Sequence, residues 1–265
     1  MFCKTNDNLS LYYEVKGNIQ SEKVLVFLNG LSQSTVSWAF FLPYFEKQYK
    51  VILLDFIFQG QSDKTGEWRS FDQHAHDVLS VLNQEKINTA SIIGISYGSL
   101  VAQHFTLNYP DRLDKLVLLS TFAHKTQYFE VIEHSWWRAL ETGGYALMFD
   151  IMLPNVLSED YFKNPLIPVE TLRALREQSN TNKDALLKLM QATKERKDYR
   201  KDLQKITAPT LVMHGEKDSL ITLTMGAEVA NNIPKAQFKI ILNAGHTLNL
   251  EKVSEVTSEI IRFLS

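Results

Sequence analysis

Short, largely apolar runs recur along this chain, and they restrict the fold more than any other feature of the sequence. The runs are rich in β-branched residues and occupy positions 23–28, 49–55, 89–95, 114–120, 209–215 and 236–242. A strand that is apolar at every position is buried on both faces, which requires helices above and below a mostly parallel sheet. Residues 9–15 alternate between apolar and polar instead, and predict a half-exposed strand at a sheet edge.

Apolar residues at helical spacing fill the segments between these runs. The clearest cases are residues 70–85, 97–110 and 250–265. The resulting alternation of strand and helix predicts an α/β fold with a mostly parallel central sheet and helices on both of its faces.

Residues 123–203 interrupt this alternation. They contain no β-branched run, are rich in helix formers and hold several large aromatic side chains. We interpret them as a helical cap inserted into a core that comprises residues 1–122 and 204–265; the alternative is extra helical packing without a pocket. Trp136 and Trp137 either shape a substrate pocket, since pockets are largely apolar and aromatic, or form the core of the cap itself.

Charge and cysteine content narrow the class of protein. Across 265 residues, 28 Lys and Arg nearly balance 30 Asp and Glu, so nucleic acid is not an expected partner. Cys3 is the single cysteine, the first ten residues lack the apolar core of a signal peptide, and the apolar runs are too short to span a bilayer. We therefore expect a cytoplasmic protein without membrane partners; its oligomeric state is not predicted.

One serine lies between two glycines where a predicted strand gives way to a helix, in the segment Gly94-Ile95-Ser96-Tyr97-Gly98. The pattern G-x-S-x-G is weak alone, but between a buried strand and a helix it indicates a nucleophile elbow. Glycines remove side chains that would collide in such a tight turn, and the N–H groups at the start of the helix favour developing negative charge. We predict that Ser96 is a nucleophile.

A serine hydroxyl needs a base to take its proton, and a carboxylate commonly orients that base. His246 lies in a loop between the run at 236–242 and the last helix. Asp218 follows the run at 209–215 after a glycine turn. Glu216 is the alternative acid, but it comes directly after that glycine and is expected to project sideways.

These residues, together with three further segments, resemble the α/β-hydrolase family over nearly the whole chain. The order Ser96, Asp218, His246 is the order of nucleophile, acid and base in that family. The further segments are LVFLNGLSQSTVSW (25–38), LLDFIFQGQSD (53–63) and HFTLNYPDRLDKLVLLS (104–120). The resemblance implies an α/β-hydrolase core with an inserted helical cap.

The same resemblance assigns the oxyanion hole to the backbone N–H groups of Leu31 and Tyr97. Since the donors are backbone groups, the side chains of Leu31 and Tyr97 remain free to line the acyl pocket. Asn29 stands where the family usually has a histidine, which changes how the oxyanion loop is braced. Ser99 stands where many relatives have a further glycine.

We predict a serine hydrolase that cleaves a small, mainly apolar ester or related acyl compound through an acyl-enzyme, without a cofactor. Reactions of C–C bond hydrolases, thioesterases, lactonases and perhydrolases on the same three residues stay open, as does a ligand receptor on the hydrolase scaffold. No metal site is predicted, because His74 and His76 are two apart on a predicted helix and point in different directions. His104 and His214 are expected to be structural.

Overall fold

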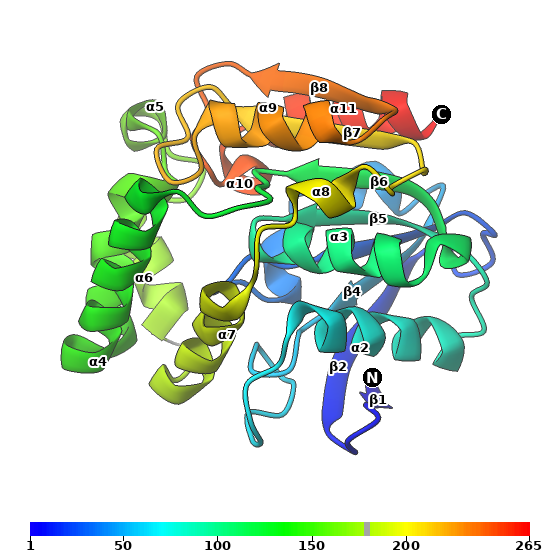
Figure 1. Ribbon diagram of the computed structural model, residues 1–265, viewed down its shortest axis with the longest axis horizontal. Coiled ribbons are helices and arrows are strands. Elements are labelled where there is room, and N and C mark those ends of the chain that lie inside the picture. The colour runs from blue at the N-terminus through cyan, green and yellow to red at the C-terminus, as the bar shows by residue number, and fades with distance from the viewer. Residues whose placement is uncertain (178–180) are drawn as a thin grey trace.

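A computed structural model describes residues 1–177 and 181–265 of the protein. Within these residues an eight-stranded sheet runs in the order β1-β2-β4-β3-β5-β6-β7-β8, with helices on both faces (Figure 1). The strands are β1 (Phe2–Lys4), β2 (Ser10–Gly17), β3 (Val24–Leu28), β4 (Lys50–Leu54), β5 (Ala90–Ile95), β6 (Leu113–Leu119), β7 (Thr210–Gly215) and β8 (Ala236–Ile241). From β4 to β8 all neighbours in the sheet are parallel, as predicted for an α/β fold.

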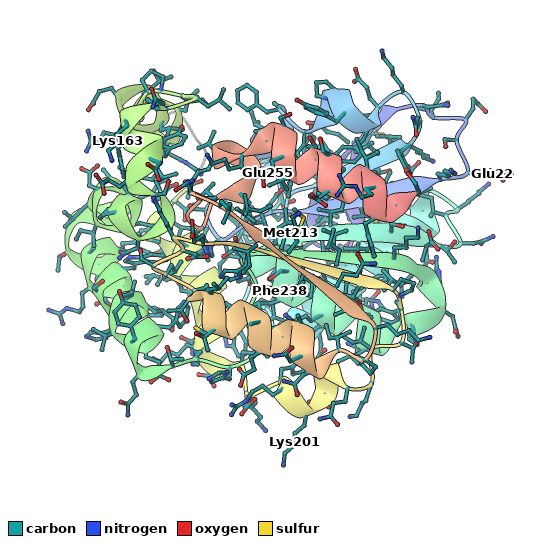
Figure 2. The ribbon with its side chains drawn as sticks, turned by 90° about the horizontal axis from the view of Figure 1, so that it is seen from above. Glu22, Lys163, Lys201, Met213, Phe238 and Glu255 are labelled. Carbon is teal, nitrogen blue, oxygen red and sulfur yellow. The ribbon has the colours of Figure 1, made fainter. Side chains whose placement is uncertain are left out.

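Two apolar clusters cover the two faces of this sheet. Every residue of β3, β5 and β7 is buried, and successive residues alternate between the faces, so that Leu25 and Val26 belong to opposite clusters. One face packs against α2 (Phe71–Gln84), α3 (Tyr97–Asn108) and α9 (Leu223–Asn232). The other packs against η1 (Thr35–Trp38), α1 (Leu42–Phe45) and α11 (Val253–Leu264). From above, β7 with Met213 lies between α9 and the helix that carries Glu255 (Figure 2).

The helices predicted at 70–85 and 97–110 correspond to α2 and α3. The predicted terminal helix is divided into α10 (Leu248–Glu251) and α11. A short turn, η2 (Pro110–Arg112), connects α3 to β6. None of the helices in the described ranges is both long and apolar enough to cross a membrane.

Two predictions about the sheet edges are wrong. The strand expected at an edge, β2, is flanked by the three residues of β1, which pair along its outer side. The run at 236–242, expected to be buried on both faces, forms the opposite edge as β8. Its residues are mostly half-buried, and Ile240 is 37% exposed, because no strand of the described chain lies beyond β8.

A helical insertion follows β6 and returns to the sheet at β7. It comprises α4 (Gln127–Val156), α5 (Glu159–Lys163), α6 (Val169–Glu177), α7 (Lys183–Glu195) and α8 (Arg200–Leu203). Figure 1 shows α4 and α6 to the left of the sheet, beyond the end of its central strands. This arrangement is that of an inserted helical cap; its extent as a separate domain, residues 123–203, stays a prediction.

Candidate active site

The predicted nucleophile lies in a sharp turn between β5 and α3. Ser96 has φ 51° and ψ −116°, in the left-handed region that a residue with a side chain rarely adopts. A Cβ atom on Gly94 would lie 2.5 Å from the carbonyl oxygen of Gly98, and one on Gly98 would lie 2.2 Å from that of Leu28. The two glycines are therefore required for α3 to begin this close to β3 and β5.

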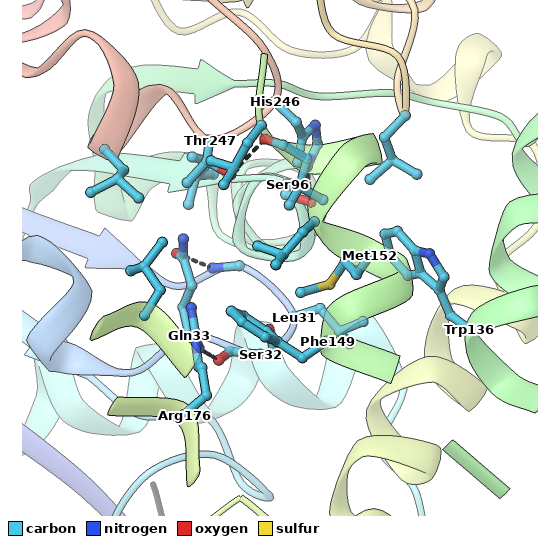
Figure 3. Close-up of a pocket in the computed structure, with 18 residues that line it drawn as sticks. Leu31, Ser32, Gln33, Ser96, Trp136, Phe149, Met152, Arg176, His246 and Thr247 are labelled. Atoms are coloured by element: carbon cyan, nitrogen blue, oxygen red, sulfur yellow. Dashed lines mark hydrogen bonds between the residues drawn. The ribbon is translucent and has the colours of Figure 1, made fainter. Parts of the chain in front are cut away.

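The structure brings the three predicted catalytic side chains together at the C-terminal ends of parallel strands, where sites of α/β proteins gather. His246 Nε2 lies 2.8 Å from Ser96 Oγ, and His246 Nδ1 lies 2.8 Å from Asp218 Oδ2 (Figure 3). Glu216, the alternative acid, instead accepts a hydrogen bond from the backbone N–H of Asn243 at the surface. The geometry therefore favours Asp218 as the partner of the imidazole.

Asp218 is buried in a setting that keeps its carboxyl group ionised. Its Oδ1 accepts hydrogen bonds from the N–H groups of Leu220 and Ile221 at 3.0 and 2.9 Å. Burial alone acts to raise the pKa of Asp218, but the charge of His246 and the hydrogen bonds from His214 and His246 outweigh it and lower the pKa to about 2. A negative Asp218 can hold the imidazole and stabilise its charged form.

Two contacts around this centre were not anticipated from the sequence. His214, expected to be structural, lies with its Nε2 3.3 Å from Asp218 Oδ2 while donating to the carbonyl oxygen of Ile221 at 2.7 Å. Ser120, at the end of β6, has φ 50° and donates from its hydroxyl to the carbonyl oxygen of His246 at 2.7 Å. Ser96 and Ser120 each follow a buried strand directly and have positive φ. Because φ is known only from coordinates, the sequence did not mark Ser120 as a special position.

The oxyanion loop is braced by neutral amides. The Asn29 side chain donates to a carbonyl oxygen at the end of β4 at 2.7 Å and accepts from the Trp38 indole at 2.8 Å. The Gln59 amide donates to the carbonyl oxygens of Gly30 and Leu31 at 2.8 and 3.0 Å. Asn29 and Gln59 thus fix the loop that carries the predicted donor at Leu31.

The two predicted oxyanion donors both lie close to Ser96, one in the wall of its cavity and one next to it in the chain. Gly30 and Leu31 line the same cavity as Ser96, and Tyr97 follows it directly. Among the described residues, no group accepts a hydrogen bond from the N–H of Leu31 or Tyr97. Both N–H groups are therefore available to a ligand.

The side chain of Tyr97 does not line the acyl pocket, which corrects that prediction. Its ring packs against Phe56, Phe71 and His74 with centroid separations of 4.9 to 5.8 Å. At the first position of α3, the side chain is directed toward α2 instead. Leu31 does line the cavity, as expected.

A cavity of about 80 Å³ lies between Ser96 and the cap (Figure 3). Its walls are mainly apolar, and the cap contributes Trp136, Phe149, Met152, Leu153, Val156, Leu157, Leu172 and Arg176. Arg176 of α6 donates a hydrogen bond to the carbonyl oxygen of Ser32, and its guanidinium lies 5.6 Å from the Phe149 ring. The wall is thus apolar near the serine, with one cationic group on the side of α6.

Trp136 and Trp137 face different surroundings. Trp136 is buried and lines the cavity that contains Ser96. Trp137 lies outside this cavity: its indole donates to Glu141 at 3.0 Å, and the Lys194 ammonium lies 5.3 Å from its ring. The prediction that Trp137 lines the substrate pocket is corrected, because consecutive residues of a helix point about 100° apart.

A larger cavity of about 550 Å³ adjoins the first one between η1 and α6. The two share Ser32, Gln33, Leu172, Arg176, Thr247 and Leu250. Hydroxyl and amide groups are frequent in the larger cavity, including those of Ser34, Thr35, Ser37, Gln61 and Asn249. Within residues 1–177 and 181–265, no group of three or more His, Cys, Asp or Glu side chains is placed to hold a metal ion.

Residues 23–253 match the family described as alpha/beta hydrolase fold. The chain belongs to the α/β-hydrolase family. Over 270 residues it is 27% identical to a 2-hydroxy-6-oxononadienedioate/2-hydroxy-6-oxononatrienedioate hydrolase of Burkholderia vietnamiensis, covering 97% of this chain and 91% of the relative. It is 25% identical to 3-oxoadipate enol-lactonase 2 of Acinetobacter baylyi, covering 94% and 90%.

Solved structures show the same architecture for this α/β-hydrolase. MGS-M2, an alpha/beta hydrolase enzyme from a Medee basin deep-sea metagenome library, superposes with a TM-score of 0.90 at 27% identity over 100% of this chain and 97% of that one. A thermophilic esterase from Thermogutta terrifontis superposes with a TM-score of 0.88 at 22% identity, over 100% and 97%. These superpositions confirm the fold, and the family match together with the sequence relatives identifies the chain as a hydrolase.

Proposed function

We propose that this α/β-hydrolase is a serine hydrolase that cleaves carboxylic esters with a short, apolar acyl group. The observation that carries the proposal is the pair of 2.8 Å contacts that His246 makes with Ser96 and Asp218 at the mouth of an apolar cavity. A nucleophile and a base within hydrogen-bond reach, with the base oriented by a third group, are what nucleophilic acyl transfer needs.

The reaction follows from the position of each group. His246 Nε2 takes the Ser96 proton as Oγ attacks the ester carbonyl, while Asp218 accepts the hydrogen bond from Nδ1. The N–H groups of Leu31 and Tyr97 stabilise the negative oxygen of the tetrahedral intermediate. The imidazolium then protonates the leaving alcohol, and water, activated by the same imidazole, releases the acid from Ser96.

The size of the inner cavity supports a short acyl group. A dry, apolar cavity of about 150 Å³ holds one benzene molecule, so about half that volume suits an acyl chain of roughly two to four carbons. The adjoining cavity of about 550 Å³ has room for the larger and more polar remainder of the substrate.

Hydrolysis of a C–C bond or of a lactone is the second candidate, and the relatives favour it. The Burkholderia vietnamiensis protein is named as a hydrolase of 2-hydroxy-6-oxo compounds and the Acinetobacter baylyi protein as an enol-lactonase. The same three residues serve both, since they supply a nucleophile, a base and an oxyanion site. A cytoplasmic location stays a prediction.

Steady-state rates on matched substrates separate the candidates. We expect nitrophenyl acetate and butyrate to turn over many times per molecule, faster than lactones or the 2-hydroxy-6-oxo compounds that name the first relative. A strong preference for either of those classes would replace the ester assignment. At most one slow event per molecule on every substrate would instead support a ligand receptor. Ser96→Ala serves as the blank throughout.

A further inference from the structure

A series of hydrogen bonds connects the end of the cap to the backbone of Ser96. It begins at Arg196, directly after α7, where Nη2 donates to Gln103 Oε1 at 2.7 Å. Gln103 Nε2 donates to Thr121 Oγ1 at 2.8 Å. Ser99 Oγ lies 2.8 Å from Thr121 Oγ1 and donates to the carbonyl oxygen of Ser96 at 2.5 Å.

The hydrogen bonds in this series point in one direction. A carbonyl oxygen can only accept, so the single hydroxyl hydrogen of Ser99 goes to Ser96 O. The hydroxyl of Thr121 is then left to donate to Ser99 Oγ, while its own oxygen accepts from Gln103. Ser99, Gln103 and Thr121 are each 0% exposed, so no water competes for these groups.

The last acceptor belongs to a peptide unit with a catalytic role. Ser96 C=O and Tyr97 N–H are the two ends of one planar trans peptide and point in opposite directions. The Ser96 carbonyl oxygen accepts hydrogen bonds from the backbone N–H groups of Ser99 and Leu100 at 2.9 and 3.3 Å, and the Ser99 hydroxyl adds a third. By adding to this hold on the carbonyl, the hydroxyl bond helps to keep the Tyr97 N–H directed toward the position of the oxyanion. The bond also draws electrons toward the carbonyl oxygen, which makes the N–H a stronger donor.

The far end of the series carries a positive charge fixed by the cap connections. The Arg196 guanidinium also donates to the carbonyl oxygen of Ala123 at 3.0 Å, and it lies 4.6 Å from the Tyr199 ring. Ala123 precedes α4 and Tyr199 precedes α8, so Arg196 connects the segments that enter and leave the cap. Figure 1 shows the chain passing from α7 across α3 to α8.

Resting on the proposed serine-hydrolase function, we propose that Ser99 is a positioning residue for the oxyanion donor Tyr97, and that Thr121, Gln103 and Arg196 reinforce it. The resemblance to the α/β-hydrolase family implies a glycine at this position in many relatives, and glycine offers no hydroxyl for this bond. The cap thereby strengthens the oxyanion site through the interior of the core, in addition to forming the wall of the pocket.

Ser99→Ala removes the hydroxyl and fills the same space with less volume. We expect kcat on nitrophenyl butyrate to fall about tenfold with KM unchanged, less than the 10²–10³ typical of losing a whole oxyanion donor. Gln103 lies two hydrogen bonds further from Ser96 than Ser99 does, so Gln103→Leu should lower kcat only about threefold. The acyl carbonyl stretch of the acyl-enzyme, measured by isotope-edited infrared spectroscopy, should move to higher wavenumber in the same order.

Thr106→Val is the matched control. Thr106 is buried on the same helix, and its hydroxyl donates to the carbonyl oxygen of Ala102 at 2.8 Å, outside the series. Thr106→Val removes a similar buried hydrogen bond from the same helix but should leave kcat and the carbonyl stretch unchanged. Equal effects of Thr106→Val and Ser99→Ala on both readouts would reduce Ser99 to a packing role and overturn the inference.

The outcomes separate this inference from the proposed function. An acyl-enzyme that depends on Ser96, with kcat and carbonyl stretch unchanged in Ser99→Ala, would refute the positioning role alone. No acyl-enzyme in the wild type would refute the proposed function. If Ser99→Ala does not fold, Ser99→Gly and Arg196→Gln take its place, and an unshifted carbonyl stretch in both overturns the inference.

Discussion

Ser96 keeps its strained backbone because its neighbours two positions away on each side have no side chains. Gly94 and Gly98 face each other across the turn, and Gly98 also faces the end of β3. The hydroxyl can therefore project toward His246 at the edge of the sheet. At the scale of single residues, the position of the Ser96 hydroxyl depends on two glycines that lie where β3, β5 and α3 meet.

Gly98→Ala tests this requirement. The added Cβ would lie 2.2 Å from the carbonyl oxygen of Leu28, so β3 and α3 have to separate; we expect several kcal/mol of lost stability and no measurable activity. Gly30→Ala is the comparison, because a Cβ there would lie 3.2 Å from the flexible Gln33 side chain, which can move. The free energy of unfolding, measured in urea, should therefore fall much less in Gly30→Ala than in Gly98→Ala. Equal losses would contradict the proposed cause.

Asp218→Asn tests the orientation of the imidazole. The variant keeps the shape but loses the charge that stabilises the imidazolium, and kcat should fall about 10⁴-fold with KM changed little. Because the pKa of Asp218 is lowered to about 2, its stabilising contribution is present above the unfolded value of 3.8 and is lost as the pH falls toward 2. A variant with kcat within tenfold of the wild type would exclude Asp218 as the acid.

Helix α2 carries a histidine into the apolar layer beside the nucleophile helix. His74 is 0% exposed and packs against Phe56 and Tyr97. Burial, aided by the nearby Arg69 charge, lowers the pKa of His74 to about 3. The His74 side chain is therefore neutral in the folded protein over the pH range in which it takes up a proton in the unfolded chain.

His74→Phe should make the protein less sensitive to acid. The contribution of His74 is fully present above its unfolded pKa of 6.5 and is lost as the pH falls from 6.5 toward 3. The free energy of unfolding, from urea titrations at pH 7, 6, 5 and 4, should decline less steeply in the variant. Parallel declines would show that His74 does not contribute to acid sensitivity in this range.

Strands that are buried on both faces were the easiest elements to predict, because their own residues are apolar. β3, β5 and β7 are buried on both faces, and their continuous apolar residues state this directly. β8 was also predicted to be buried on both faces, but Gln237 and Lys239 interrupt its apolar residues, and it lies at an edge of the sheet. The order of the strands depends on pairing between distant segments of the chain. Contacts between elements, such as Ser120 with His246, were missed for the same reason.

Within the site, backbone features were easier to predict than the directions of side chains. The G-x-S-x-G turn and the order of acid and histidine are local patterns, and the structure places these groups within hydrogen-bond reach. Phe129, Ile132, Trp136 and Leu140 recur at helical spacing and are buried in α4. This pattern separates Trp136 from Trp137 but was not used in the prediction. The direction of the Tyr97 side chain, toward α2 at the start of α3, was likewise not predicted.

In the whole molecule, the inner cavity exists because the cap lies over the C-terminal ends of the central strands. The sheet supplies Ser96 and His246, and α4 supplies much of the opposite wall, including Met152. Under the proposed function, the cap would set the length of the acyl group, whereas the reacting groups belong to the core.

Met152→Ala should shift the acyl-length preference. Met152 is 6% exposed and lines the cavity, whereas Ile151, the preceding residue, is 39% exposed and does not line it. We expect kcat/KM for nitrophenyl hexanoate to rise about tenfold relative to butyrate in Met152→Ala, and to stay unchanged in Ile151→Ala. An unchanged preference in both would place the acyl group elsewhere.

Labelling with a fluorophosphonate probe tests the central assignment most directly, because the probe bonds only to a serine whose hydroxyl is activated by its neighbours. The wild type should be labelled once per molecule, with the modified peptide containing Ser96, and Ser96→Ala should not be labelled. His246→Ala should react far more slowly than the wild type. Equal labelling of the wild type and Ser96→Ala would contradict the assignment of Ser96 as the nucleophile.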